Sequence, residues 1–241
     1  DGASLTFTAS ETAGQAFLGF YTNGAFATSN AVFTWEDIVA DGTLTAEFEL
    51  ATIYADAARP DDAGDGWTWA TAKRTLQAAV DAALTGTATV DQVMAAPGLY
   101  GPIETDDRTL AIRSAAGAAA TIISGNGLAR CATLATNASG TNTLLSGFTL
   151  QDGEAEEGGG AYGGTLEDCI LTGNHAWVGG GAFGGCLRRC LLPRNTANMG
   201  GGAYDEYAGL QVLEECELKE NEALTGGGTY YGNLSRCRLQ G

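Results

Sequence analysis

Four segments in the second half of the chain repeat one pattern of apolar and polar positions. Each has Leu, then Cys three residues later, then Leu two residues after the Cys; the segments span 166–174, 187–195, 213–221 and 234–239. The first three end on Asn, and a run of three glycines and then an aromatic residue follow each Asn. The cysteines are 21, 26 and 21 residues apart, so the unit is a 21-residue coil with one five-residue insertion after Tyr204.

The end of the Leu-x-x-Cys-x-Leu pattern alternates with a period of two, which is typical of a β-strand. The glycine runs disfavour an α-helix in the same unit. Short strands that recur with every coil predict a solenoid whose coils stack at about 4.8 Å. Crossovers between parallel strands are almost always right-handed. We therefore predict an all-β fold, a right-handed parallel β-helix over 51–241 with regular coils from about residue 145.

Each column of the repeat has a predicted structural role. The leucines are expected to point inward, and the cysteines to fill the same narrow interior as small apolar groups. The asparagines are expected at a corner, where this residue tolerates the left-handed conformation and where stacked amides can bond from coil to coil. The predicted structural ladder consists of Cys169, Cys190, Cys216 and Cys237 together with Asn174, Asn195 and Asn221.

The two residues before each ladder cysteine change the sign of their charge from coil to coil. They are Glu167-Asp168, Arg188-Arg189, Glu214-Glu215 and Ser235-Arg236. Opposite charges on neighbouring strands attract, whereas a slip of one coil would pair like charges. We predict that this column fixes the register of the coils.

A helix is predicted over 68–85, where a solenoid needs a cover for its first coil. Thr68 suits the N-cap and Gly86 the position after the helix, and apolar residues lie between them at helical spacing (Trp69, Ala72, Leu76, Ala79 and Ala83). This segment resembles the capping helix of bacterial right-handed β-helix proteins, and Ala-Pro-Gly-Leu-Tyr at 96–100 resembles their first-coil signature. The glycine runs and Leu-x-x-Asn steps resemble the repeats of polymorphic outer-membrane proteins, which implies a surface role by analogy.

Residues 1–50 are predicted to form a separate small module. Leu5, Phe7 and Ala9 alternate with polar residues, Asn23-Gly24 marks a hairpin turn, and residues 44–50 alternate again. The pattern resembles the internalin-type B repeat of bacterial surface proteins, a β-grasp-like module, without its usual opening strand. We therefore divide the chain into an incomplete B-repeat-like module over 1–50 and a β-helix over 51–241.

The net charge of the chain limits the kinds of partner that it can bind and bears on where the protein is located. Lys and Arg number 12 and Asp and Glu 29, which gives a formal charge of −17. Nucleic acid and anionic lipid should therefore be repelled. No apolar run approaches the roughly 18 residues of a membrane span. Together with the resemblances, these features favour a protein that is secreted or held on a bacterial cell surface.

Two kinds of chemistry are candidates. Pectate-lyase-like enzymes share the predicted fold. This resemblance implies calcium held by carboxylates and an Arg or Lys base on one face of the helix. Arg188 or Arg189 could be the base, and the neighbouring acidic pairs could hold the calcium. Asp61, Asp62 and Asp65 on a glycine-containing turn are a candidate calcium site, with an ordinary solvated turn as the alternative. No other cofactor is expected.

Other reactive and aromatic residues have simpler expectations. His175 is the sole histidine and is expected to be exposed at a corner. The ladder cysteines are expected to be buried thiols, while Cys131 and Cys186 lie outside their column and are the more reactive pair. The aromatic column either belongs to the core or faces outward, where it could stack on sugars; it consists of Tyr162, Phe183, Tyr204 and Tyr230.

The leading hypothesis is a non-enzymatic extracellular or cell-surface protein with a structural or adhesive role. Its expected partners are further copies of itself, or carbohydrate or protein on a cell surface. If the sequence is the natural mature form, an uncapped last strand and a missing first strand predict end-to-end association into filaments; the alternative is that both features come from truncation of a longer chain. A calcium-dependent polysaccharide lyase is the alternative function.

Overall fold

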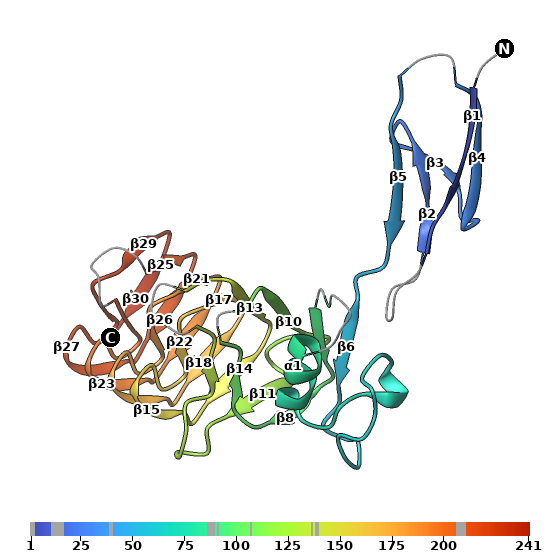
Figure 1. Ribbon diagram of the computed structural model, residues 1–241. Coiled ribbons are helices and arrows are strands. Elements are labelled where there is room, and N and C mark those ends of the chain that lie inside the picture. The colour runs from blue at the N-terminus through green and yellow to red at the C-terminus, as the bar shows by residue number, and fades with distance from the viewer. Residues whose placement is uncertain are drawn as a thin grey trace.

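Short β-strands are the main secondary structure of the protein, as Figure 1 shows for a computed structural model. The structure describes residues 3–10, 17–38, 41–85, 90, 92–106, 108–135, 137, 140–205 and 211–241. These residues contain 30 strands, one α-helix and one short 3₁₀ helix. The all-β prediction is therefore confirmed. No helix in this described part of the chain is long and apolar enough to cross a membrane.

The described residues among the first fifty form two small antiparallel sheets, which stand apart from the rest of the molecule (Figure 1). In one, β1 (Ala3–Thr8) pairs with β4 (Val32–Ile38). In the other, β2 (Phe17–Thr22) pairs with β3 (Ala25–Thr28) and β5 (Leu44–Phe48). Asn23 and Gly24 join β2 to β3 with φ angles of 50° and 81°. The predicted hairpin turn is thus confirmed, because both central residues are left-handed.

From Thr52 onward the strands stack into four parallel sheets, each taking at most one strand from a coil. The first sheet has eight strands: β6 (Thr52–Ala55), β7 (Gln92–Ala95), β10 (Leu110–Ser114), β13 (Thr143–Ser146), β17 (Thr165–Glu167), β21 (Cys186–Arg188), β25 (Val212–Glu214) and β29 (Asn233–Ser235). The second has seven: β8 (Gly98–Tyr100), β11 (Thr121–Ser124), β14 (Thr149–Gln151), β18 (Ile170–Thr172), β22 (Leu191–Pro193), β26 (Glu217–Lys219) and β30 (Arg238–Gln240).

The other two sheets are shorter. The third has six strands: β9 (Ile103–Glu104), β12 (Ala132–Thr133), β16 (Ala161–Tyr162), β20 (Ala182–Phe183), β24 (Ala203–Tyr204) and β28 (Thr229–Tyr230). The fourth has four: β15 (Glu154–Glu157), β19 (His175–Val178), β23 (Thr196–Met199) and β27 (Glu222–Thr225). A regular coil visits the first, second, fourth and third sheets in that order before the next coil begins.

The register follows the sequence repeat. Leu166 pairs with Leu187, and Leu187 with Leu213, so the register resumes after the insertion that follows Tyr204. That insertion falls mostly on 206–210, outside the described residues. Six of the predicted inward leucines are at most 1% exposed and share one core with the ladder cysteines: Leu166, Leu171, Leu187, Leu192, Leu213 and Leu218. The prediction is wrong for the last coil, where Leu234 and Leu239 are 40% and 52% exposed because no further coil of the described chain covers them.

The backbone conformation at the corners contradicts one prediction. The backbone is left-handed at the residue before each ladder cysteine, with φ of 51–56° at Asp168, Arg189, Glu215 and Arg236. At the next corner, Gly173, Arg194 and Glu220 are left-handed, at 64°, 55° and 52°. The prediction that the ladder asparagines take this conformation is wrong. The residue before each Asn turns the chain, which leaves the Asn side chain free to bond inside the coil.

The single helix predicted over 68–85 is also wrong. A 3₁₀ helix, η1 (Trp69–Thr71), is capped by Thr68, and α1 (Leu76–Thr85) follows it separately. The break coincides with two contacts to residues earlier in the chain. Lys73 bridges to Ala55 in the first sheet, and the Asp62 carboxylate accepts hydrogen bonds from the amide and hydroxyl of Thr75, at 2.8 and 3.0 Å.

α1 packs against the earliest strands of the solenoid. It contacts β6, β7 and β9, and three of its side chains are buried there (Leu76, Ala79 and Val80). Trp69, predicted to share this apolar stripe, is instead 43% exposed and packs against Tyr54, with ring centroids 4.4 Å apart and planes tilted by 52°. The predicted C-terminal Gly86 lies outside the described residues.

Candidate functional site

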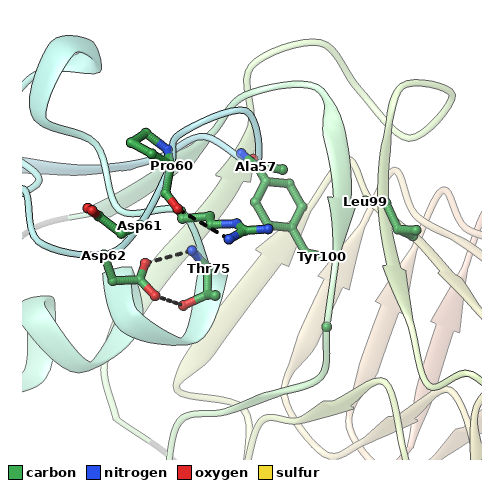
Figure 2. Close-up of a pocket in the computed structure, with 9 residues that line it drawn as sticks. Ala57, Pro60, Asp61, Asp62, Thr75, Leu99 and Tyr100 are labelled. Atoms are coloured by element: carbon green, nitrogen blue, oxygen red, sulfur yellow. Dashed lines mark hydrogen bonds between the residues drawn. The ribbon is translucent and has the colours of Figure 1, made fainter.

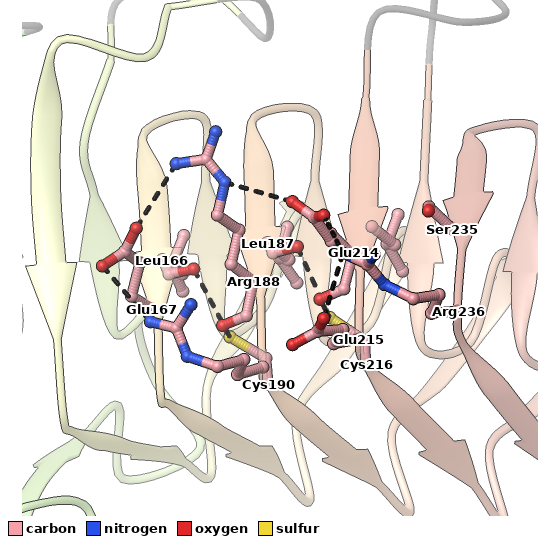
Figure 3. A network of polar contacts seen from close by, with 12 residues as sticks. Leu166, Glu167, Leu187, Arg188, Cys190, Glu214, Glu215, Cys216, Ser235 and Arg236 are labelled. Carbon is pink, nitrogen blue, oxygen red and sulfur yellow. Dashed lines mark hydrogen bonds and ion pairs between the residues drawn. The ribbon is translucent and has the colours of Figure 1, made fainter.

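The alternating charges form a continuous ladder on the outside of the first sheet (Figure 3). Glu167 lies opposite Arg188, and Arg188 opposite Glu214, on consecutive strands. Arg188 pairs with both carboxylates, at 3.3 and 3.7 Å. Arg189 forms a two-pronged contact with Asp168, at 2.8 and 2.9 Å. The expected pairing of opposite charges between coils is therefore present.

The same pattern continues into the next coil, where Arg236 pairs with Glu214 and, at 3.0 Å, with Glu215. The side chains of the ladder are 23–64% exposed. Pairs this exposed are worth only about 0–1 kcal/mol each. Their main effect is on register, because a slip by one coil would replace attraction with repulsion.

The contact between Arg189 and Asp168 also shifts the pKa of both groups. The Arg189 guanidinium hydrogen-bonds the Asp168 carboxylate and holds the pKa of Asp168 below its usual range. The same contact raises the pKa of Arg189 above its ordinary value. A base that removes a proton from substrate must first lose its own proton. Arg189 is therefore poorly suited to the base of a lyase.

Arg189→Gln is expected to return the pKa of Asp168 towards that of a free carboxyl, because the hydrogen bonds to its charged form are lost. Since the folded-state pKa is depressed, the stabilisation by this pair is present above the unfolded pKa of about 3.9 and disappears as the pH falls through the folded value. NMR titration of the carboxyl checks this. Arg194→Gln, at an exposed corner, is the control and should leave Asp168 unchanged; an unchanged Asp168 in Arg189→Gln would contradict the pairing.

The predicted asparagine ladder lies inside the solenoid. Asn174 and Asn195 are 0% exposed. The Asn195 side-chain oxygen accepts from the backbone and side-chain nitrogens of Asn174, at 3.1 and 3.0 Å. Its side-chain nitrogen donates to the carbonyl of Leu171 at 2.8 Å and to the side-chain oxygen of Asn221 at 3.1 Å. The prediction of amides bonded from coil to coil is confirmed.

All six cysteines are free thiols. Those of the ladder donate weak hydrogen bonds to carbonyls of the preceding coil, for example Cys190 to Leu166 at 3.5 Å. Cys131 and Cys186, the expected reactive pair, lie beside different sheets and form no disulfide. Burial raises the pKa of Cys131 to about 12 and also raises that of Cys186. Both thiols are thus held in the unreactive protonated form.

The aromatic column forms its own stack between the third and fourth sheets. Consecutive rings from Tyr162 to Tyr230 lie 5.2–5.4 Å apart and nearly parallel. Phe183 is 2% exposed and packs with Val178 in a second, smaller apolar cluster. The guanidinium of Arg130 covers the Tyr162 ring at 4.9 Å. The ring faces that could have stacked on sugars are therefore largely covered by one another and by Arg130.

Asp61 and Asp62 line a pocket of 490 Å³ between the loop before α1 and the second sheet (Figure 2). Each aspartate of the proposed calcium site has its own hydrogen-bond partner. Asp61 accepts from the amide of Ala63, Asp65 from that of Trp67, and Asp62 from Thr75. Within the described residues, no three His, Cys, Asp or Glu side chains gather in a way that could hold a metal ion.

The outward side of the fourth sheet is a surface that the sequence analysis did not single out. Its strands present Glu154 and Glu156, then His175 and Trp177, then Thr196 and Asn198, then Glu222 and Leu224. Trp177 is 65% exposed. The His175 side chain is exposed, as predicted, and its Nδ1 lies 2.7 Å from Glu154 Oε1. Two hollows of 350 and 320 Å³ open on this side.

The alternation of side chains between the two sides of β19 could have revealed this surface. In His-Ala-Trp-Val at 175–178, the alternate residues Ala176 and Val178 are buried, whereas His175 and Trp177 are exposed, as expected for a strand with one side towards solvent. Comparison with known proteins adds nothing to this picture: no protein-family model, no curated protein and no solved structure matches the chain.

Proposed function

We propose that residues 51–241 form a right-handed parallel β-helix whose first coil is covered by α1, and that the chain is a non-enzymatic scaffold with an adhesive or structural role. The handedness follows the general rule for crossovers between parallel strands. The proposed location is extracellular or on a bacterial cell surface, with residues 1–50 as an incomplete B-repeat-like module.

The observation that carries the proposal is the charge ladder. Its three arginines, Arg188, Arg189 and Arg236, are each held in ion pairs with carboxylates of their neighbours. A lyase needs carboxylates open to a metal and a base open to substrate. Side chains that bind one another across consecutive strands serve the stacking of coils instead.

The alternative is a calcium-dependent polysaccharide lyase, and an activity assay separates the two. We expect no unsaturated product, followed by ultraviolet absorbance, when the protein is incubated with pectin or alginate and calcium. Robust turnover that disappears in Arg188→Ala or Arg189→Ala would overturn the scaffold proposal. Antibody labelling of intact producing cells tests the proposed location. End-to-end association remains a prediction, which sedimentation at micromolar concentration tests.

A further inference from the structure

The exposed indole of Trp177 forms one wall of the 350 Å³ hollow on the outward side of the fourth sheet. The other lining residues are Glu156 and Glu157 of β15 and Val178 of β19. β15 and β19 are neighbours in register, with Ala155 opposite Ala176, so Glu156 and Trp177 lie side by side at about 4.8 Å backbone spacing. The hollow therefore combines one aromatic face with two carboxylates.

Within the described part of the chain, these carboxylates are not held in salt bridges, although the charge of Arg130 does act on Glu157. In the described residues, no Lys or Arg forms an ion pair with Glu156 or Glu157. The guanidinium of Arg130 donates to the backbone carbonyl of Glu157, at 2.7 Å, and not to its carboxylate. His175, on the same outward side, is bonded to Glu154. The hollow is thus lined by an aromatic ring and negatively charged carboxylates, and it is open to solvent.

An aromatic face next to carboxylates is the arrangement that binds an organic cation, through the ring quadrupole and charge-assisted hydrogen bonds. We propose that this hollow receives the ammonium or guanidinium group of a basic segment on a partner protein. The inference rests on the proposed adhesive function and deepens it by naming the chemistry of the partner. The formal charge of −17 further favours approach of such a segment.

The second hollow suggests the spacing of cations on the partner. It is lined by residues of β23 and β27, including Asn198, Leu224 and the carboxylate of Glu222. β27 lies two strands beyond β19, or about 10 Å away along the axis. In a polyproline II segment, residues three apart lie on the same side and about 9 Å apart. Two basic residues three positions apart would therefore reach both hollows.

The test uses the whole chain and a synthetic peptide with two lysines three positions apart, at low salt. Binding is measured by calorimetry and by the NMR signal of the Trp177 indole. We expect Trp177→Ala to weaken binding about five- to thirtyfold, acetylation of both lysines to weaken it at least tenfold, and Glu156→Gln to weaken it less. Higher salt should weaken it as well.

Two variants serve as controls. Trp69→Ala removes another exposed tryptophan, one that packs against Tyr54, and Glu217→Gln removes a half-buried carboxylate of the second sheet. Neither should change binding, and the melting curve of Trp177→Ala should match that of the natural chain. Equal binding of the acetylated peptide, or no effect of Trp177→Ala, would overturn the proposal.

A neutral oligosaccharide is the competing ligand for an exposed tryptophan. If a glucose hexasaccharide perturbs the Trp177 indole and the lysine peptide does not, the surface binds sugar and the cation proposal fails. That result would leave the adhesive function standing, whereas lyase turnover would remove the adhesive function whatever the peptide does. The two failures are thus distinguishable.

Discussion

Replacing Leu192 with Asp is expected to unfold the C-terminal coils, with a loss of more than about 4 kcal/mol in the free energy of unfolding. Leu192 is 0% exposed and belongs to the central core. A carboxylate there would have no partner and no water, so it would either remain charged at high cost or bind a proton. Because each coil contacts only its neighbours, the damage should spread towards the C-terminus first.

Circular dichroism during denaturation and limited proteolysis check this expectation, since protease should release a shortened solenoid. Leu191→Asp is the matched control, because Leu191 is the adjacent residue of β22 and points to the opposite face. It should cost less than about 1 kcal/mol, mainly through repulsion by Glu217 on the next strand. An unchanged melting curve for Leu192→Asp would show that this column faces water.

Asn195→Ala is expected to lower the free energy of unfolding by about 3–5 kcal/mol, because it leaves several buried groups without partners. The carbonyl of Leu171 and the amide of Asn174 both lose their bonds to the Asn195 side chain. Each unsatisfied buried group costs about 1–3 kcal/mol. Urea denaturation measures the loss.

Substitutions of two other asparagines serve as comparisons for Asn195→Ala. Asn221→Ala removes equivalent bonds at a partly exposed site, where water can replace them, so its cost should be smaller. Asn198→Ala changes the outward side of the same coil and should cost less than about 0.5 kcal/mol. If all three variants lose the same stability, the buried ladder has no special role.

The repeated columns made most of the solenoid predictable. Leu, Cys and Asn recur at fixed intervals, and a residue that recurs in this way occupies one environment in every coil. The helix before the first coil was harder to predict, because apolar residues continue at helical spacing across the break between η1 and α1. The break coincides with the contact of Thr75 with Asp62, thirteen residues earlier, which no local pattern reveals. Similarly, the left-handed residues at the corners include Arg189 and Glu215, types that do not signal a turn.

The candidate sites divide in the same way. The charge ladder was predictable because its members recur next to the cysteines. The aspartates at 61, 62 and 65 are close in sequence, but each binds a nearby backbone amide, so proximity along the chain did not produce a shared site. Trp177 has no counterpart in other coils, where the equivalent positions hold Glu156, Asn198 and Leu224. Because this tryptophan is not repeated from coil to coil, the repeat pattern could not predict its position.

The alternating ladder has a consequence for how such a chain could change length during evolution. Its true period is two coils, one acidic and one basic, although the apolar pattern repeats with every coil. Gain or loss of a single coil by gene duplication or deletion would place like charges on adjacent strands, which is destabilising. Gain or loss of two coils preserves every contact. Related genes should therefore differ by even numbers of coils wherever this ladder is kept.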